Sequence, residues 1–129
     1  MKFMLTIDEV GTLLDEIAEE IPKEFYRYLN GGIILFDEEK PHPRAPGKLC
    51  IMGEYHNQRD LGRCIRIYYG SFARVYGHLS PAAAKAELRK ILLHEFTHHL
   101  ESLAGERDLE ITDAIQIEDF LNPRKGQGM

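Results

Sequence analysis

Apolar residues recur at helical spacing near the start of the chain, with acidic residues between them. The apolar positions are Val10, Leu13, Leu14, Ile17 and Ile21. They predict an amphipathic helix over about Asp8–Glu20, and Thr6 with Glu9 three residues later has the form of a capping box. Pro22 comes directly after this segment and ends the helix or starts the next turn. We therefore expect only a short second helix over Lys23–Leu29, which ends at the sequence Asn30-Gly31-Gly32.

The middle of the chain has the short apolar and alternating runs that are typical of strands. Ile33–Phe36 is a continuous apolar run between turn signals and predicts a buried strand. Leu49–His56 and Arg63–Tyr69 predict a hairpin with its turn near Asn57–Asp60, since the second segment alternates between two faces. Glu38–Lys48, with three prolines and a glycine, predicts a loop.

The longest predicted element is a helix in the last third of the chain. Ser80 as N-cap before a proline marks its start, and the pattern predicts a helix over Pro81–Leu103 that stops before Gly105. A last helix is expected over Thr112–Leu121, and residues 122–129 read as a frayed tail. Helices, strands and helices in this order predict an α+β fold, with a small, mostly antiparallel sheet packed on the long helix.

Composition narrows the class of protein. The chain has 129 residues, which predicts one domain over residues 1–121. Its apolar fraction of 43% and charged fraction of 29% are those of a soluble globular protein. A net charge of −5 argues against a nucleic-acid partner. No apolar run approaches the about 20 residues of a membrane helix, so a cytoplasmic monomer is expected.

The two cysteines are expected to be free thiols. In the predicted hairpin register, Cys50 faces a residue near Tyr68 and Cys64 faces one near Glu54, so the two are not cross-strand partners. Two cysteines are also too few for a disulfide scaffold. Both observations favour a reducing compartment.

The long helix carries the sequence His94-Glu95-Phe96-Thr97-His98, which matches the pattern HExxH. Residues four apart on a helix lie on one face, so His94 and His98 can bind one metal ion from the same side. Glu95 is rotated by about 100° from His94, which puts its carboxylate beside the metal as a general base. Zinc suits such a site, because it accepts imidazole ligands and leaves a position open for water.

The opposite face of this helix supports the assignment. Its apolar residues form one arc on the helical wheel, nearly opposite His94: Leu88, Leu92, Leu93, Phe96, Leu100 and Leu103. The arc is expected to pack on the core and leave the histidine face for polar chemistry. His99 falls inside the arc, so we interpret it as a buried histidine that supports the site without binding the metal.

A catalytic zinc site needs a third protein ligand. The downstream acidic candidates are Glu101, Glu106, Asp108, Glu110 and Asp113. Glu101 lies on the right face, but three ligands stacked on one straight helix suit a tetrahedral ion poorly. A break at Gly105 that returns the chain toward the metal favours Glu106 or Asp108, and the residues alone leave this choice open.

The sequence resembles the small zincin-like bacterial metallopeptidases. The resemblance rests on the run Leu92–His99, on Gly53-Glu54-Tyr55 before the hairpin turn, and on Ile65–Tyr69 after it. It implies a compact zincin-like fold, a single zinc ion and a peptidase. It also implies an acidic third ligand three residues past a glycine, which here points to Asp108, with Glu106 as the alternative.

The resemblance further implies a peptide or protein substrate, bound along an exposed strand edge beside the active helix. Tyr55, His56 or Tyr68 would then stabilise the oxyanion. Two other functions fit the same residues. One is a catalytically silent zincin-like module that binds a partner, and the other is a regulatory protease that cleaves a repressor.

Overall fold

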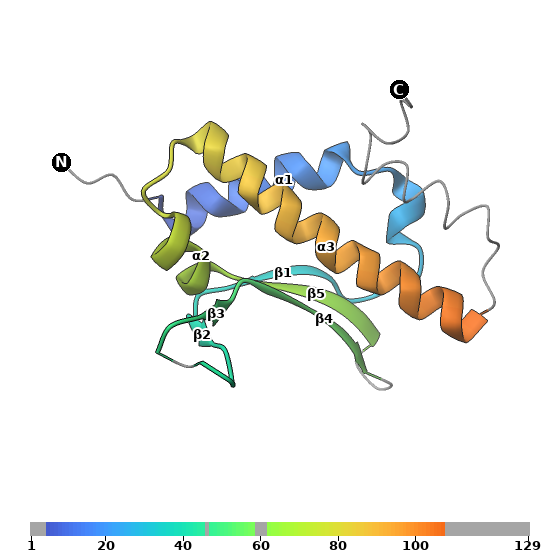
Figure 1. The fold of residues 1–129 in the computed structure, drawn as a ribbon. Coiled ribbons are helices and arrows are strands. Elements are labelled where there is room, and N and C mark those ends of the chain that lie inside the picture. The colour runs from blue at the N-terminus through green and yellow to red at the C-terminus, as the bar shows by residue number, and fades with distance from the viewer. Residues whose placement is uncertain (1–4, 46, 59–61, 108–129) are drawn as a thin grey trace, which may run out of the picture.

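The structure is a computed structural model that describes residues 5–45, 47–58 and 62–107. The chain folds as α+β, with α1 and α3 on one face of a small mixed sheet (Figure 1). The elements are α1 (Ile7–Glu20), the 3-10 helix η1 (Lys23–Tyr26), β1 (Gly32–Phe36), β2 (Lys40–Pro41), β3 (Cys50–Ile51), β4 (Gly53–Gln58), β5 (Gly62–Tyr68), α2 (Tyr69–Tyr76) and α3 (Pro81–Arg107).

The main sheet has three strands in the order β1-β5-β4. The predicted hairpin is confirmed, because β4 and β5 pair antiparallel. The three-stranded sheet is mixed, however, because β1 pairs with β5 in parallel, with Ile33 opposite Ile65. Parallel pairing needs a long connection, and the segment between β1 and β5, which contains β2, β3 and β4, provides it.

The hairpin register differs by two residues from the predicted one. Cys64 lies opposite His56, and Glu54 lies opposite Arg66. A shift of two leaves every side chain on its predicted face. Both cysteines are free, as expected. Cys50 pairs with Pro41 in a separate two-stranded sheet, so the segment predicted as a loop contains the short strand β2.

The first helix begins as predicted. The Thr6 hydroxyl accepts a hydrogen bond from the Glu9 backbone (3.1 Å), and the Glu9 carboxylate accepts one from the Thr6 backbone (2.7 Å). The second predicted helix is shorter than expected, since η1 ends at Tyr26. The chain then turns at Tyr28, whose φ of 66° is in the left-handed region.

The long helix does not stop before Gly105. It continues through this glycine to Arg107, because a glycine inside a helix costs only about 1 kcal/mol, which the preceding turns of good helix formers readily offset. The helix α2, which follows directly from β5, was not predicted. The expected helix Thr112–Leu121 and the tail 122–129 lie outside the described residues.

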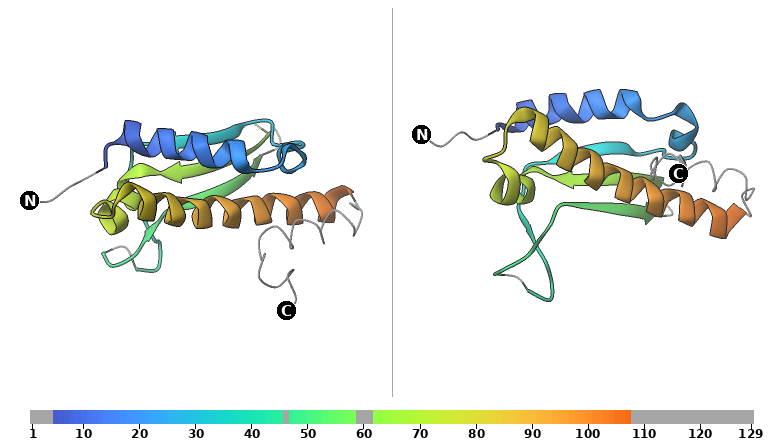
Figure 2. Two further views of the ribbon diagram at one scale, coloured as in Figure 1. Left: turned by 90° about the horizontal axis from the view of Figure 1, so that it is seen from above. Right: turned by 45° about the horizontal axis from the view of Figure 1, so that its top comes forward.

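The core lies between the helices and the sheet. α1 and α3 run side by side over the sheet (Figure 2). Fully buried side chains from each layer meet there: Val10, Ile17, Ile65, Ile67, Leu88, Leu92 and Phe96. Burying each contributes about 1.5–3 kcal/mol. None of the described helices combines the length and apolar character that a bilayer crossing requires.

One glycine lets α3 approach the edge of this sheet. A Cβ atom added at Gly53 would lie 3.1 Å from Ile67 Cδ1 and 3.2 Å from Ile91 Cγ2. Such contacts are tighter than ordinary van der Waals packing. The absence of a side chain on β4 therefore sets how closely the first half of α3 packs on this strand.

Candidate metal centre

The HExxH residues lie in the middle of α3. Leu92 and Phe96 are fully buried on its apolar face, while His94 and His98 are exposed. The helical wheel predicted this division between an apolar arc and a histidine face, and the burial of these residues confirms it. The fold thus presents the two imidazoles outward from a helix whose other side is fixed in the core.

The two imidazoles converge. His94 Nε2 and His98 Nε2 are 3.2 Å apart, and the ring planes are inclined by 88°. Two nitrogen ligands on a tetrahedral zinc ion, each at about 2.0–2.1 Å, lie about 3.3 Å apart. The separation of the two nitrogen atoms therefore fits a shared zinc ion.

Glu95 occupies a different environment from its two neighbours in the motif. Its side chain is only 6% exposed, and it makes no hydrogen bond to another described residue. Burial raises the pKa of this carboxyl, with a further rise from nearby Glu54, although His98 acts in the opposite direction. A carboxylate whose pKa is raised is a better proton acceptor, which is what a general base requires.

A groove of about 790 Å³ lies between α3 and the edge strand β4. Its walls come from these two elements and from Ile51 of β3: Ile51, Gly53, Glu54, Tyr55, His56, His94, Glu95, His98, Glu101 and Ser102. All three HExxH side chains line it. The fold thus brings the motif and the hairpin together, and the hairpin was predicted as part of the site.

On the strand side of the groove, Glu54 is the centre of a hydrogen-bond cluster. Its Oε1 atom accepts from His56 Nε2 (2.8 Å), from the Tyr68 hydroxyl (2.8 Å) and from Lys40 Nζ (2.9 Å). Burial alone raises the pKa of Glu54, but these three donors outweigh it and lower the pKa to about 2. The carboxylate is therefore ionised and holds the His56 ring in place at the groove.

Sequence reasoning missed Glu54 and Lys40. The available signal was the alternation of β4, which puts Glu54 and His56 on one face two residues apart. Lys40 could not have been found in this way, because it comes from β2, fourteen residues earlier in the chain.

The three predicted oxyanion residues have different surroundings. Tyr68 is 2% exposed, does not line the groove, and donates its hydroxyl to Glu54. The Tyr55 hydroxyl donates to His99 Nδ1 (2.8 Å), although the side chain lines the groove. His56 lines the groove with one ring nitrogen engaged by Glu54. Of the three, His56 has the surroundings that suit contact with a substrate.

His99 is buried, as its place in the apolar arc predicts. It accepts from the Tyr55 hydroxyl at Nδ1, and its Nε2 donates to the Arg27 carbonyl (2.8 Å). Burial lowers the pKa of His99, although its bond to Arg27 acts in the opposite direction. A neutral His99 therefore ties α3, next to His98, both to β4 and to the end of η1.

No third His, Cys, Asp or Glu side chain completes a metal-binding group within the ranges that the structure describes. Asp108 lies outside those residues, as does the side chain of Glu106. Because α3 continues past Gly105, the break invoked for these two candidates is absent at that position. Glu101 Oε1 lies 3.5 Å from His98 Nδ1, the ring nitrogen of His98 that does not face His94.

We expect Glu54→Gln to lower the unfolding free energy in a pH-dependent way. The folded pKa of about 2 lies below the ordinary value of 4.5, so the contribution is complete above about pH 4.5 and is lost as the pH falls toward 2. Urea unfolding should separate wild type and variant by about 1–2 kcal/mol at pH 7 and by about half as much or less at pH 3. Glu87→Gln, which removes only a pair with Lys90, is the control. An equal difference at both pH values would contradict the assignment.

No family model and no curated protein matches the sequence. Among solved structures, the fold is similar to that of a conserved hypothetical protein from Thermus thermophilus. The two sequences are 39% identical, and the superposition has a TM-score of 0.67. The match covers 78% of this chain and 98% of the other. This identity over most of both chains shows common family membership.

Proposed function

The chain belongs to the same family as this conserved hypothetical protein of Thermus thermophilus, and we propose that it is a zinc-dependent metallopeptidase of the small zincin-like type. The observation that carries the proposal is the convergence of His94 Nε2 and His98 Nε2 at 3.2 Å, beside a buried carboxylate. When bound, zinc supplies a Lewis acid that acidifies water and polarises a peptide carbonyl. His94 and His98 would hold the ion, and Asp108, which directly follows the last residue of α3, is the proposed third ligand. Glu106, the alternative, would require the last turns of α3 to unwind, because eight helical residues put it about 12 Å beyond His98 along the axis.

Glu95 is the proposed general base. Its burial and its raised pKa favour acceptance of a proton from water at the moment of attack on the peptide carbonyl. The same carboxyl then returns the proton to the leaving amine. Glu95 is 6% exposed, so few water molecules other than the reacting one can reach its carboxylate.

The substrate is proposed to be an extended peptide that binds in the groove along β4. An edge strand beside an active helix can bind the main chain of a peptide and leave its side chains to the groove walls. His56, held by Glu54 at 2.8 Å, is the side chain proposed to face the reacting carbonyl from the strand side. A ring already fixed by a carboxylate loses little freedom when the substrate binds.

Zinc binding tests this proposal most directly. The full chain, stripped of metal and titrated with zinc against a chromophoric chelator, should bind about one ion per chain. His98→Ala removes one of the two converging nitrogen atoms and should weaken binding at least about tenfold. His78→Ala, at an exposed histidine between α2 and α3, is the matched control. Equal zinc affinity in His98→Ala and wild type would refute the proposed centre.

A further inference from the structure

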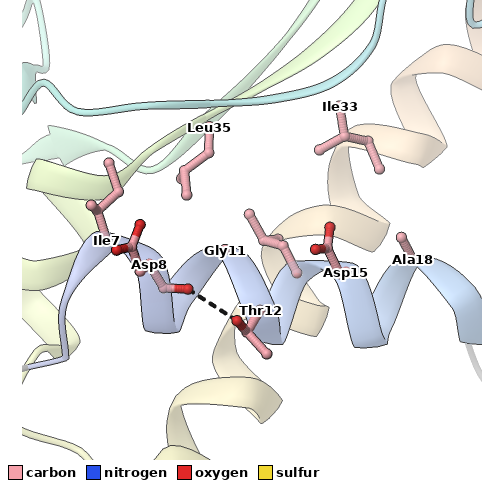
Figure 3. Close-up of a pocket in the computed structure, with 9 residues that line it drawn as sticks. Ile7, Asp8, Gly11, Thr12, Asp15, Ala18, Ile33 and Leu35 are labelled. Atoms are coloured by element: carbon pink, nitrogen blue, oxygen red, sulfur yellow. Dashed lines mark hydrogen bonds between the residues drawn. The ribbon is translucent and has the colours of Figure 1, made fainter.

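A second groove lies between α1 and β1, and shares no lining residue with the metal centre. Figure 3 shows α1 passing beneath the strand, with Ile33 and Leu35 pointing toward the helix. The groove has a volume of about 470 Å³. Leu35 packs over Gly11, since a Cβ added at Gly11 would lie 3.7 Å from Leu35 Cδ2, an ordinary van der Waals distance.

The strand beside this groove is an edge of the described sheet. Tyr68 N donates to Met52 O (2.9 Å), so even-numbered residues of β5 bond toward β4 and odd-numbered ones bond toward β1. In the register of β1 with β5, the backbone N–H and C=O groups of Ile33 and Leu35 then point away from β5, toward the open edge of the described sheet. An outward row of donors and acceptors beside a groove of mixed polar and apolar lining can accept one more strand.

Among the described residues, the charged side chains that line this groove are all acidic. α1 carries six acidic residues and no lysine or arginine. On its side toward α3, Glu16 and Glu20 are paired with Lys85 Nζ at 3.1 and 3.3 Å. Asp8 and Asp15 instead line the groove, and neither has an ion pair within the described ranges. A strand that binds here would therefore gain most from carrying basic residues.

The spacing of the two carboxylates specifies a pattern. Asp8 and Asp15 are seven residues apart, which is about 10.5 Å along a helix, and Gly11 lies between them. Side chains on one face of a strand lie about 6.7 Å apart, so three of them span about 13 Å. The outer two can reach Asp8 and Asp15 with long basic side chains, while the middle one packs beside Leu35, which covers Gly11.

We propose that the groove between α1 and β1 binds an extended basic segment of a partner protein, which adds to β1 as a fourth strand. The three side chains of the segment that face the groove are basic, apolar and basic, in that order. Its backbone pairs with Ile33 and Leu35, and its basic side chains pair with Asp8 and Asp15. This docking surface is separate from the zinc proposal and does not depend on it.

The test uses two synthetic peptides and the isotope-labelled full chain. The first peptide, acetyl-Thr-Lys-Thr-Val-Thr-Lys-Thr-amide, has the inward pattern, and the second has glutamate in place of both lysines. In an NMR titration, the lysine peptide should bind at least about tenfold more tightly. The largest amide shifts should be at residues 33–35 and along α1.

Variants distinguish this groove from general attraction to an acidic protein. Asp15→Lys should weaken binding of the lysine peptide about tenfold, whereas Glu19→Lys, the same charge change at an exposed position that does not line the groove, should change it less than about twofold. Urea unfolding of both variants checks that each is folded. Equal affinities of the two peptides, equal effects of the two variants, or shifts centred on β4 would overturn the proposal. Dimerisation of the chain through β1 without peptide would overturn it too, since the occupant would then be a second copy.

Discussion

Glu95→Gln should keep the zinc affinity of the wild type and lower the rate of peptide hydrolysis by about 10³-fold. Glutamine has nearly the same shape, but it accepts no proton from water. The side chain is 6% exposed, and burial raises its pKa, so the neutral amide should not destabilise the fold. This combination separates the chemistry of Glu95 from any structural role.

The measurement is turnover of a fluorogenic peptide library by the zinc-loaded chain, with zinc content and urea unfolding recorded for each variant. Glu87→Gln is the matched control, because Glu87 lies on the same helix and pairs with Lys90 away from the groove. Its rate should equal that of the wild type. Wild-type turnover by Glu95→Gln would exclude Glu95 as the base, even if zinc binding by His94 and His98 held.

His99→Leu should lower the unfolding free energy by about 3 kcal/mol. The substitution removes two hydrogen bonds inside the protein, one from the Tyr55 hydroxyl and one to the Arg27 carbonyl. A buried polar group that loses its partner costs about 1–3 kcal/mol. Urea unfolding at pH 7 measures the loss, and His78→Leu at an exposed position should stay within about 0.5 kcal/mol.

A double-mutant cycle identifies the Tyr55–His99 bond as part of this cost. Tyr55→Phe removes the hydroxyl, so His99→Leu should cost about 1 kcal/mol less in that background than in the wild type. Additive effects of the two substitutions would mean that the hydrogen bond between the Tyr55 hydroxyl and His99 Nδ1 contributes nothing to stability.

Elements with strong local signals were predictable from the sequence. The capping box at Thr6, the apolar run of β1 and the apolar arc of α3 each follow from residues close together in the chain, and all three are present. The convergence of His94 and His98 belongs to this class, because four-residue spacing on a helix is itself a local property.

Features that depend on distant pairing were not predictable in the same way. The parallel pairing of β1 with β5 depends on which strand occupies the centre of the sheet, and no local pattern encodes this. The Glu54 cluster depends on Lys40, which reaches Glu54 from a strand expected to be loop. At Gly105 the local signal gave a wrong prediction. Glycine often follows the last turn of a helix, but α3 continues through Gly105 to Arg107.

Gly53 has a consequence for how the groove can vary among related chains. A side chain at Gly53 would contact Ile67 and Ile91 at 3.1–3.2 Å. It would therefore act as a wedge that separates the sheet from α3. Since Glu54 follows on the same strand and Glu95 follows Ile91 by about one turn, the wedge would move the two walls apart. The width of the groove in such chains can therefore be adjusted at Gly53, without any change to the HExxH residues on α3.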